Sequence, residues 1–96
     1  MQSDFMSLYE LAHQHAKSGR FKEAGQLYID LLHQNPTNVE VIHDLVFCLD
    51  KLGQTEDAEK FLRSLGPVVH KTESLWQQLD YLAQINLPKV AVPRVL

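Results

Sequence analysis

The side chains with the most chemical potential in this sequence are its five histidines and its single cysteine. His13 and His15 are two positions apart, and a helix advancing about 100° per residue points them to different faces, so they cannot bind one metal together. Cys48 has no basic partner nearby in the sequence and lies beside an apolar stripe, which favours a buried thiol over a nucleophile. The other histidines fall in separate predicted elements: His33, His43 and His70.

Other catalytic patterns are missing as well. The serines are not set in a nucleophile elbow, and no glycine-rich loop could cradle a phosphate. We therefore expect a chain that is not an enzyme and that has no catalytic residues, no metal and no cofactor.

Composition limits the classes of protein that remain. The chain has 96 residues, of which 45% are apolar and 22% charged, and its net charge is −3, as in one small globular domain. It has no cluster of lysine and arginine for nucleic acid, no apolar run near the roughly 18 residues of a membrane span, and a polar N-terminus unlike a secretory signal. A lone cysteine fits the cytoplasm, although a mature periplasmic fragment would look the same.

The elements that position these residues are predicted to be helices. Apolar residues recur at helical spacing in five stretches: residues 4–17, 19–36, 37–53, 55–65 and 72–85. Gly19 and Gly53 end the first and third stretches, and Gly66-Pro67 breaks the fourth. Thr37 and Glu40 are spaced as a capping box that would begin the third helix.

The apolar stripes repeat with one shift along the chain. Gly19 and Gly53 are 34 residues apart, as are Ala24 and Ala58. The same shift relates stripe residues in the first, third and fifth stretches: Leu8, Ile42 and Trp76, and likewise Leu11, Leu45 and Leu79. A period of 34 residues with two helices per unit is typical of the tetratricopeptide repeat, and the first unit resembles that family closely.

The resemblance implies an all-α fold, an alpha-alpha superhelix of antiparallel helix pairs. We expect a helical domain over residues 1–86, with repeat one at 5–38, repeat two at 39–72, a capping helix at 72–85 and a Pro/Val-rich tail at 87–96. Repeat two departs from the family pattern, with Thr55 where an aromatic residue is usual and His70 where a proline is expected. The alternative to a capping helix is that the chain is cut from a longer array.

The resemblance also implies that the first helix of each repeat lines a concave groove in which peptides or helices bind. Helical geometry places two columns of side chains about 100° or more from the apolar stripe of the first helix and its repeats. These columns are the candidate groove residues: Tyr9, His43 and Gln77, and His13, Phe47 and Tyr81. The alternative is that these rings pack against neighbouring first helices.

The expected partner is a protein. One subgroup of the family grips a C-terminal carboxylate with lysine, arginine and asparagine, but the matching places here hold other residue types: Tyr9, His13, Asp44, Ser74 and Gln78. With acidic residues nearby at Glu40, Asp44 and Asp50, a neutral to basic segment with apolar anchors suits this surface better.

The leading functional hypothesis is a noncatalytic protein–protein interaction module that binds a peptide or helix in the concave groove. One alternative is a structural or assembly protein that forms homo-oligomers through its solenoid ends. Another is a small secretion or export chaperone.

Overall fold

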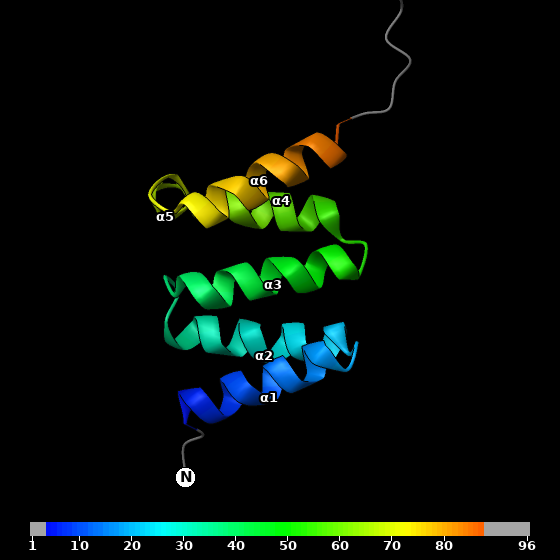
Figure 1. The fold of residues 1–96 in the computed structure, drawn as a ribbon. Coiled ribbons are helices and arrows are strands. Elements are labelled where there is room, and N and C mark those ends of the chain that lie inside the picture. The colour runs from blue at the N-terminus through cyan, green and yellow to red at the C-terminus, as the bar shows by residue number, and fades with distance from the viewer. Residues whose placement is uncertain (1–3, 88–96) are drawn as a thin grey trace, which may run out of the picture.

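The computed structural model describes residues 4–87, and these residues form helices with no strand. The elements in chain order are α1 (Phe5–Lys17), α2 (Phe21–Gln34), α3 (Val39–Lys51), α4 (Thr55–Ser64), α5 (Pro67–His70) and α6 (Glu73–Ile85). The helices stack as successive rungs from α1 to α6 (Figure 1). The predicted all-α class is confirmed, whereas the tail predicted at residues 87–96 lies almost entirely outside the described residues.

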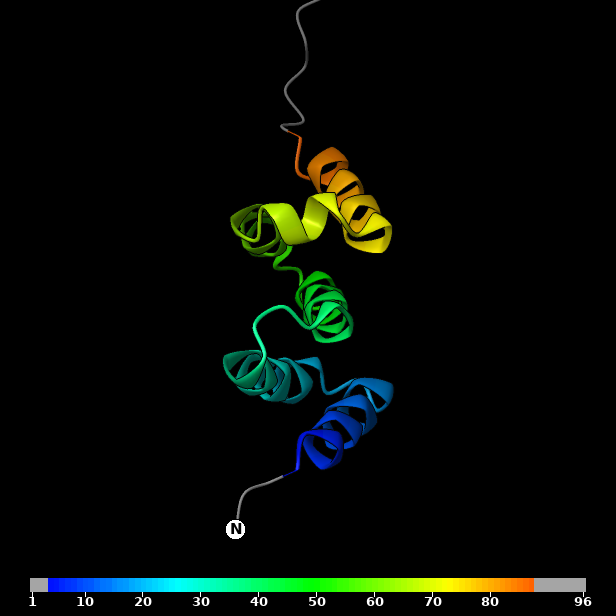
Figure 2. The ribbon, with the colours of Figure 1, turned by 90° about the vertical axis from the view of Figure 1, so that its left-hand side faces the viewer.

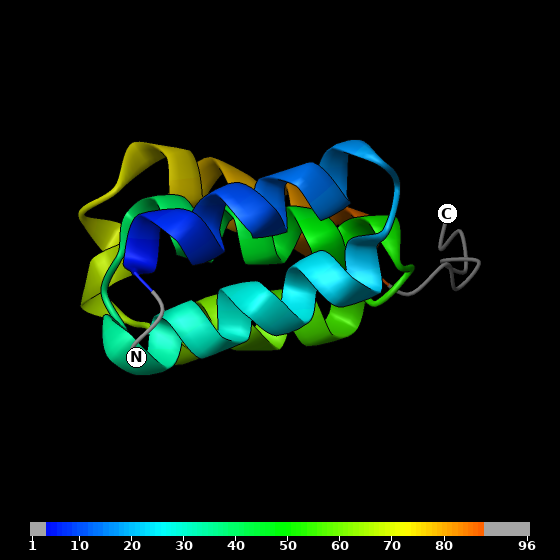
Figure 3. The ribbon, with the colours of Figure 1, turned by 90° about the horizontal axis from the view of Figure 1, so that it is seen from below.

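The long helices form two layers. Seen along the stack, α1, α3 and α6 occupy one row, and α2 and α4 occupy the other (Figure 3). The view from the side shows the chain crossing between the layers at each turn (Figure 2). This alternation is the helical-repeat arrangement that the 34-residue shift predicts, with α1, α3 and α6 as the first helices.

Two glycines shape equivalent turns, one after α1 and one after α3. Gly19 has a φ of 79° and Gly53 a φ of 78°, a left-handed conformation that costs a residue with a side chain about 1 kcal/mol or more. After each glycine, the next backbone N–H reaches back five residues. Arg20 donates to the carbonyl of His15, and Gln54 donates to that of Leu49, both at 2.8 Å. The same Schellman-type ending therefore closes α1 and α3.

The core consists of two apolar clusters that share α3. Val41, Leu45 and Cys48 face α1 and α2 and are buried there with Ala12 and with the inner side of α2. Ile42 and Val46 belong to a second cluster with α4, α5 and α6. Because these residues occupy adjoining angles of one helix, α3 joins both halves of the domain. The buried residues of each cluster are all of apolar types.

Two local predictions need correction. The third helix begins at Val39, so its N-cap is Asn38, whose side-chain oxygen accepts a hydrogen bond from the Val41 N–H at 3.1 Å. The predicted capping box at Thr37 is wrong, because Thr37 lies in the turn before the cap. The break at Gly66-Pro67 also contains an unpredicted short helix, α5, in which proline takes the first position, where its missing N–H costs nothing.

Two stripe residues are more exposed than their spacing indicates. Leu11 is 42% exposed and Trp76 is 49% exposed, although Leu45 and Ile42, their equivalents in α3, are buried. The reason is position in the stack. Leu45 packs in the cluster with α2, and Ile42 packs in the cluster with α4. Within residues 4–87, no helix precedes α1 and no second helix follows α6, so these two side chains have no such neighbour.

Candidate functional site

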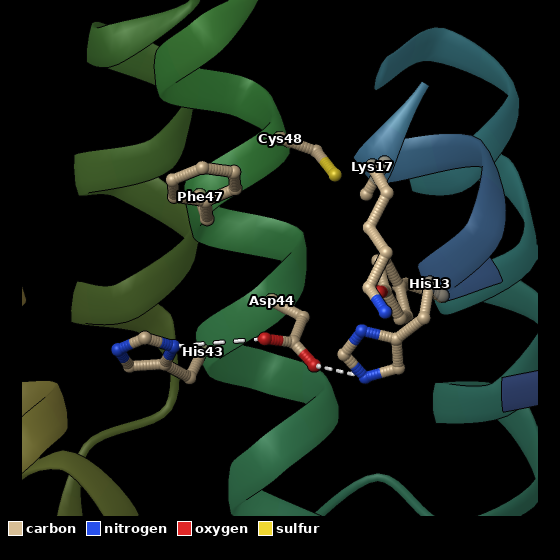
Figure 4. A pocket seen from close by; sticks show the side chains of 8 residues that line it. His13, Lys17, His43, Asp44, Phe47 and Cys48 are labelled. Atoms are coloured by element: carbon tan, nitrogen blue, oxygen red, sulfur yellow. Dashed lines mark ion pairs between the residues drawn. The ribbon is translucent and has the colours of Figure 1, made fainter. Parts of the chain in front are cut away.

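A pocket of about 340 Å³ opens between α1 and α3, on the layer of first helices. Its walls come from both helices and its floor from α2 (Figure 4). The lining residues are His13, Ala16 and Lys17 of α1, Tyr28 of α2, and His43, Asp44, Phe47 and Cys48 of α3. This volume is at the lower end of the range for ligand pockets, so the pocket suits a single side chain or a small group.

Asp44 is the polar centre of this pocket. One carboxylate oxygen, Oδ2, accepts a hydrogen bond from the Tyr9 hydroxyl at 3.0 Å and lies 3.4 Å from Nε2 of His13. The other oxygen, Oδ1, lies 3.7 Å from Nδ1 of His43 (Figure 4). The side chain is 23% exposed. A half-buried carboxylate therefore faces two imidazoles from different helices.

Phe47 forms the apolar side of the pocket. Its ring meets the Phe21 ring edge-on, with the ring centres 5.9 Å apart. The Lys51 ammonium lies 5.4 Å from the centre of the same ring, within cation–π range. Phe47 nevertheless remains 43% exposed. A half-exposed ring beside a half-buried carboxylate offers both an apolar and a charged contact to a bound group.

The structure brings four of the six candidate groove residues together. His13, His43 and Phe47 line the pocket. Tyr9 lies next to it through its hydrogen bond to Asp44, but its ring packs against the core cluster of α1 and α2. The Tyr9 ring thus packs toward Tyr28 of α2, and its hydroxyl reaches the neighbouring first helix, α3.

The two candidates on α6 lie apart from the pocket. Tyr81 is 52% exposed, and Gln77 is exposed with its amide 3.4 Å from the Glu73 carboxylate. The link from α6 to the pocket is instead Gln78, whose side-chain amide donates to the backbone carbonyl of His43 at 3.1 Å. The face of α1, α3 and α6 is thus continuous, but only its first half is hollowed into this pocket.

Sequence reasoning missed the central role of Asp44. It placed Asp44 at a groove position that matches the carboxylate-gripping residues of one family subgroup and noted its charge, but did not include it among the candidate residues. The available signal was its angle on α3, where Asp44 falls between Phe47 and the buried Cys48, at the edge of the core. Which side chains Asp44 meets depends on how α1 packs against α3, and the residue pattern within one helix does not specify that packing.

The negative charge of Asp44 helps to keep two neighbouring groups, Tyr9 and Cys48, protonated. Burial, and next the hydrogen bond to Asp44, raise the pKa of Tyr9, so its hydroxyl remains a hydrogen-bond donor. Burial, and next the negative charge of Asp44, raise the pKa of the Cys48 thiol to about 11. A thiol that is protonated at neutral pH is a poor nucleophile, although it lines the pocket.

Two other kinds of site, for a metal ion and for a membrane, were also sought among the described residues. Among residues 4–87, no cluster of three or more His, Cys, Asp and Glu side chains is arranged to hold a metal ion. In the same part of the chain, every helix is too short or too polar to cross a bilayer. What the geometry provides is a layered helical scaffold with a small mixed pocket, as in helical-repeat binding proteins.

Comparison with known proteins agrees with this class. The family described as "Tetratricopeptide repeat" matches residues 15–85. The chain is also 35% identical to human "Tetratricopeptide repeat protein 7A" over 66 residues, which are 69% of this chain and 8% of that protein. The chain therefore belongs to the tetratricopeptide repeat family, whose repeats generally mediate protein–protein interaction and are noncatalytic. It spans only a small part of the length of this relative.

Proposed function

We propose that this chain is a protein-interaction module that binds a peptide or helix of a partner protein on the face formed by α1, α3 and α6. The expected partner segment is neutral to basic and has apolar anchors. This proposal extends the general role of the family to one face of this chain.

The observation that carries the proposal is the pocket between α1 and α3, with the half-exposed ring of Phe47 at its edge. A large apolar ring that stays exposed beside a pocket is a typical interface anchor, because it contributes contact area with few rotatable bonds to restrict. The carboxylates of Glu40, Asp44 and Asp50 on the same helix favour a partner that is not acidic.

The test compares partner capture by the wild-type chain, Phe47→Ala and Trp76→Ala. Trp76 is exposed to a similar degree but lies on another side of α6, well over 100° from Tyr81 on the helical wheel. We expect Phe47→Ala to weaken binding of the captured protein by about 1–3 kcal/mol and Trp76→Ala to leave it unchanged. Affinities are measured with the purified pair by calorimetry.

The packing of Phe47 on Phe21 adds a second readout. Since the ring is partly buried, its loss should also lower the free energy of unfolding by about 1 kcal/mol. Binding is therefore measured at a temperature where all three proteins are fully folded by circular dichroism. Equal affinity of the wild-type and Phe47→Ala chains under these conditions would refute the proposed face.

A second candidate function, end-to-end assembly, is favoured by one observation. Trp76 is half exposed and lines a smaller cavity of about 250 Å³ with residues of α4 and α5. If solenoid ends associate through this ring, light scattering should show a mass that rises with protein concentration and that Trp76→Gln returns to the monomer. A concentration-independent monomer mass for the wild-type chain would exclude this candidate.

We also propose a reducing compartment such as the cytoplasm. The chain has a single cysteine, which is buried, and so it can form no internal disulfide.

A further inference from the structure

We propose that the pocket between α1 and α3 binds one basic side chain, arginine or lysine, of the partner segment, with its cationic group at Asp44. This inference rests on the proposed function and specifies the chemistry of one subsite on that face.

The first observation is the unused half of the Asp44 carboxylate. Oδ2 has the Tyr9 hydroxyl at 3.0 Å and the His13 ring nitrogen at 3.4 Å. Within residues 4–87, Oδ1 accepts no hydrogen bond, and the ring nitrogen that faces it, His43 Nδ1, is 3.7 Å away, beyond hydrogen-bonding distance. An ionised carboxylate has about four acceptor positions, so at least two remain open beside the cavity.

The second observation is the apolar part of the pocket lining. Ala16, Tyr28, Phe47 and Cys48 present carbon, sulfur and aromatic surface to the pocket. Arginine and lysine combine an apolar stem with a charged end, so the stem can lie against these walls while the cation reaches the carboxylate. Arginine also stacks on aromatic faces, and Phe47 already has a cation, Lys51, near its ring.

The same geometry argues against acidic, apolar and neutral polar side chains in this pocket. An acidic side chain would meet Asp44 with like charge. An apolar side chain would remove water from the open oxygen and leave a buried carboxylate without a partner, which is costly. A neutral polar side chain could hydrogen-bond to Oδ1 but would lack the stronger charge-assisted bond.

One residue opposes a cationic guest. Lys17 lines the same pocket and makes no ion pair within the described part of the chain (Figure 4). Its side chain is long and the residue is exposed, so its ammonium can move into solvent when the guest enters. This opposition predicts that removing the Lys17 charge strengthens binding of a basic guest.

The experiment titrates the 96-residue protein, labelled with nitrogen-15, with N-acetyl-arginine amide and with its neutral isostere N-acetyl-citrulline amide. Both probes are taken into the millimolar range. We expect the arginine probe to shift the backbone amide signals of His13, Asp44 and Phe47 saturably. The citrulline probe should bind at least about tenfold more weakly than the arginine probe, because only the cation forms a charge-assisted bond with Asp44.

Three variants localise the effect. Asp44→Asn keeps the shape of the side chain and should weaken the arginine probe about tenfold with little change for citrulline. Lys17→Met should strengthen the arginine probe. Asp50→Asn removes the same charge from the same helix outside the pocket lining. Asp50 is only partly buried, so its charge is screened by solvent and salt, and this variant should change the affinity less than about twofold.

Several results would overturn the inference. These are equal binding of the two probes, unchanged affinity in Asp44→Asn, or absence of saturable shifts at the pocket for the arginine probe. The comparison of the two probes uses the wild-type protein and does not depend on whether a variant folds. Peptides selected from a display library that lose binding in Phe47→Ala but carry no basic residue would overturn this inference while supporting the proposed function.

Discussion

Replacing Ala24 with leucine tests the packing between α1 and α2, which holds the pocket walls in place. Ala24 lies on α2 and is completely buried, as is Ala12 on α1 in the same cluster. Both residues are small, and the sequence repeats the alanine of α2 at Ala58 of α4, which is also fully buried. The spacing of the paired helices therefore depends on small side chains at these points.

Two opposing contributions decide whether this substitution raises or lowers the free energy of unfolding. Leucine adds three carbons, which would stabilise the protein by roughly 2 kcal/mol if they were buried without strain. Because no surface of Ala24 is accessible, the added carbons must displace neighbouring side chains or α1 itself. Overpacking of this kind costs about 1–3 kcal/mol net, whereas helix propensity hardly changes. We therefore expect the free energy of unfolding to fall by about 1–3 kcal/mol.

The assay is urea denaturation followed by circular dichroism. Ala83→Leu on α6 is the matched control, because Ala83 is only partly buried and no helix follows α6 within residues 4–87. There the change should stay within about 0.5 kcal/mol. A denaturation midpoint for Ala24→Leu at or above that of the wild-type chain would show that α1 and α2 are not closely packed at this residue.

Two further predictions concern the backbone and the thiol. Gly53→Ala should destabilise the protein by about 1 kcal/mol because the φ of Gly53 is positive, although the added carbon meets no atom. Gly25→Ala should instead stabilise the protein by about 0.5–1 kcal/mol, because Gly25 is helical and the added carbon only touches Cys48 and Leu45 at 3.8 Å. Thermal melts of both variants check the two signs, and a stabilised Gly53→Ala would contradict the first. Since the folded-state pKa of Cys48 is about 11 against an ordinary 9.0, its contribution to stability should be complete below pH 9 and lost as the pH rises through about 11. Urea midpoints measured across that range follow this loss, and alkylation with iodoacetamide at neutral pH should be slow until the chain unfolds; rapid alkylation of the folded protein would contradict the burial of the thiol.

Much of the fold was accessible from spacing alone because helical repeats are built from local contacts. Apolar periodicity and the two glycines located the five main helices, and the 34-residue shift placed them in equivalent pairs. The φ angles of Gly19 and Gly53 differ by only a degree, so the sequence match between these turns corresponds to a match in geometry. Periodicity was less reliable at helix starts, where Asn38 rather than Thr37 is the cap.

Periodicity also could not tell which stripe residues would be covered. Trp76 and Ile42 occupy equivalent positions, and both are apolar. One is half exposed and the other buried, since burial depends on whether a second helix packs against the stripe. A pattern within one helix carries no information about that neighbour.

The sequence by itself determined the helical class, the repeat and the layer on which Phe47, His13 and His43 lie. Tertiary structure alone decided that α1 packs so that Tyr9 and His13 both meet Asp44, and that a pocket remains between them. It also brought the end of α6 to α4, where the Asn86 amide donates hydrogen bonds of 2.9 Å to the Thr55 carbonyl and to the Glu59 carboxylate. The physical reason is the same in both cases. Helix formation depends on residues three and four apart, whereas these contacts join residues about 30 positions apart, whose meeting depends on the packing of whole helices.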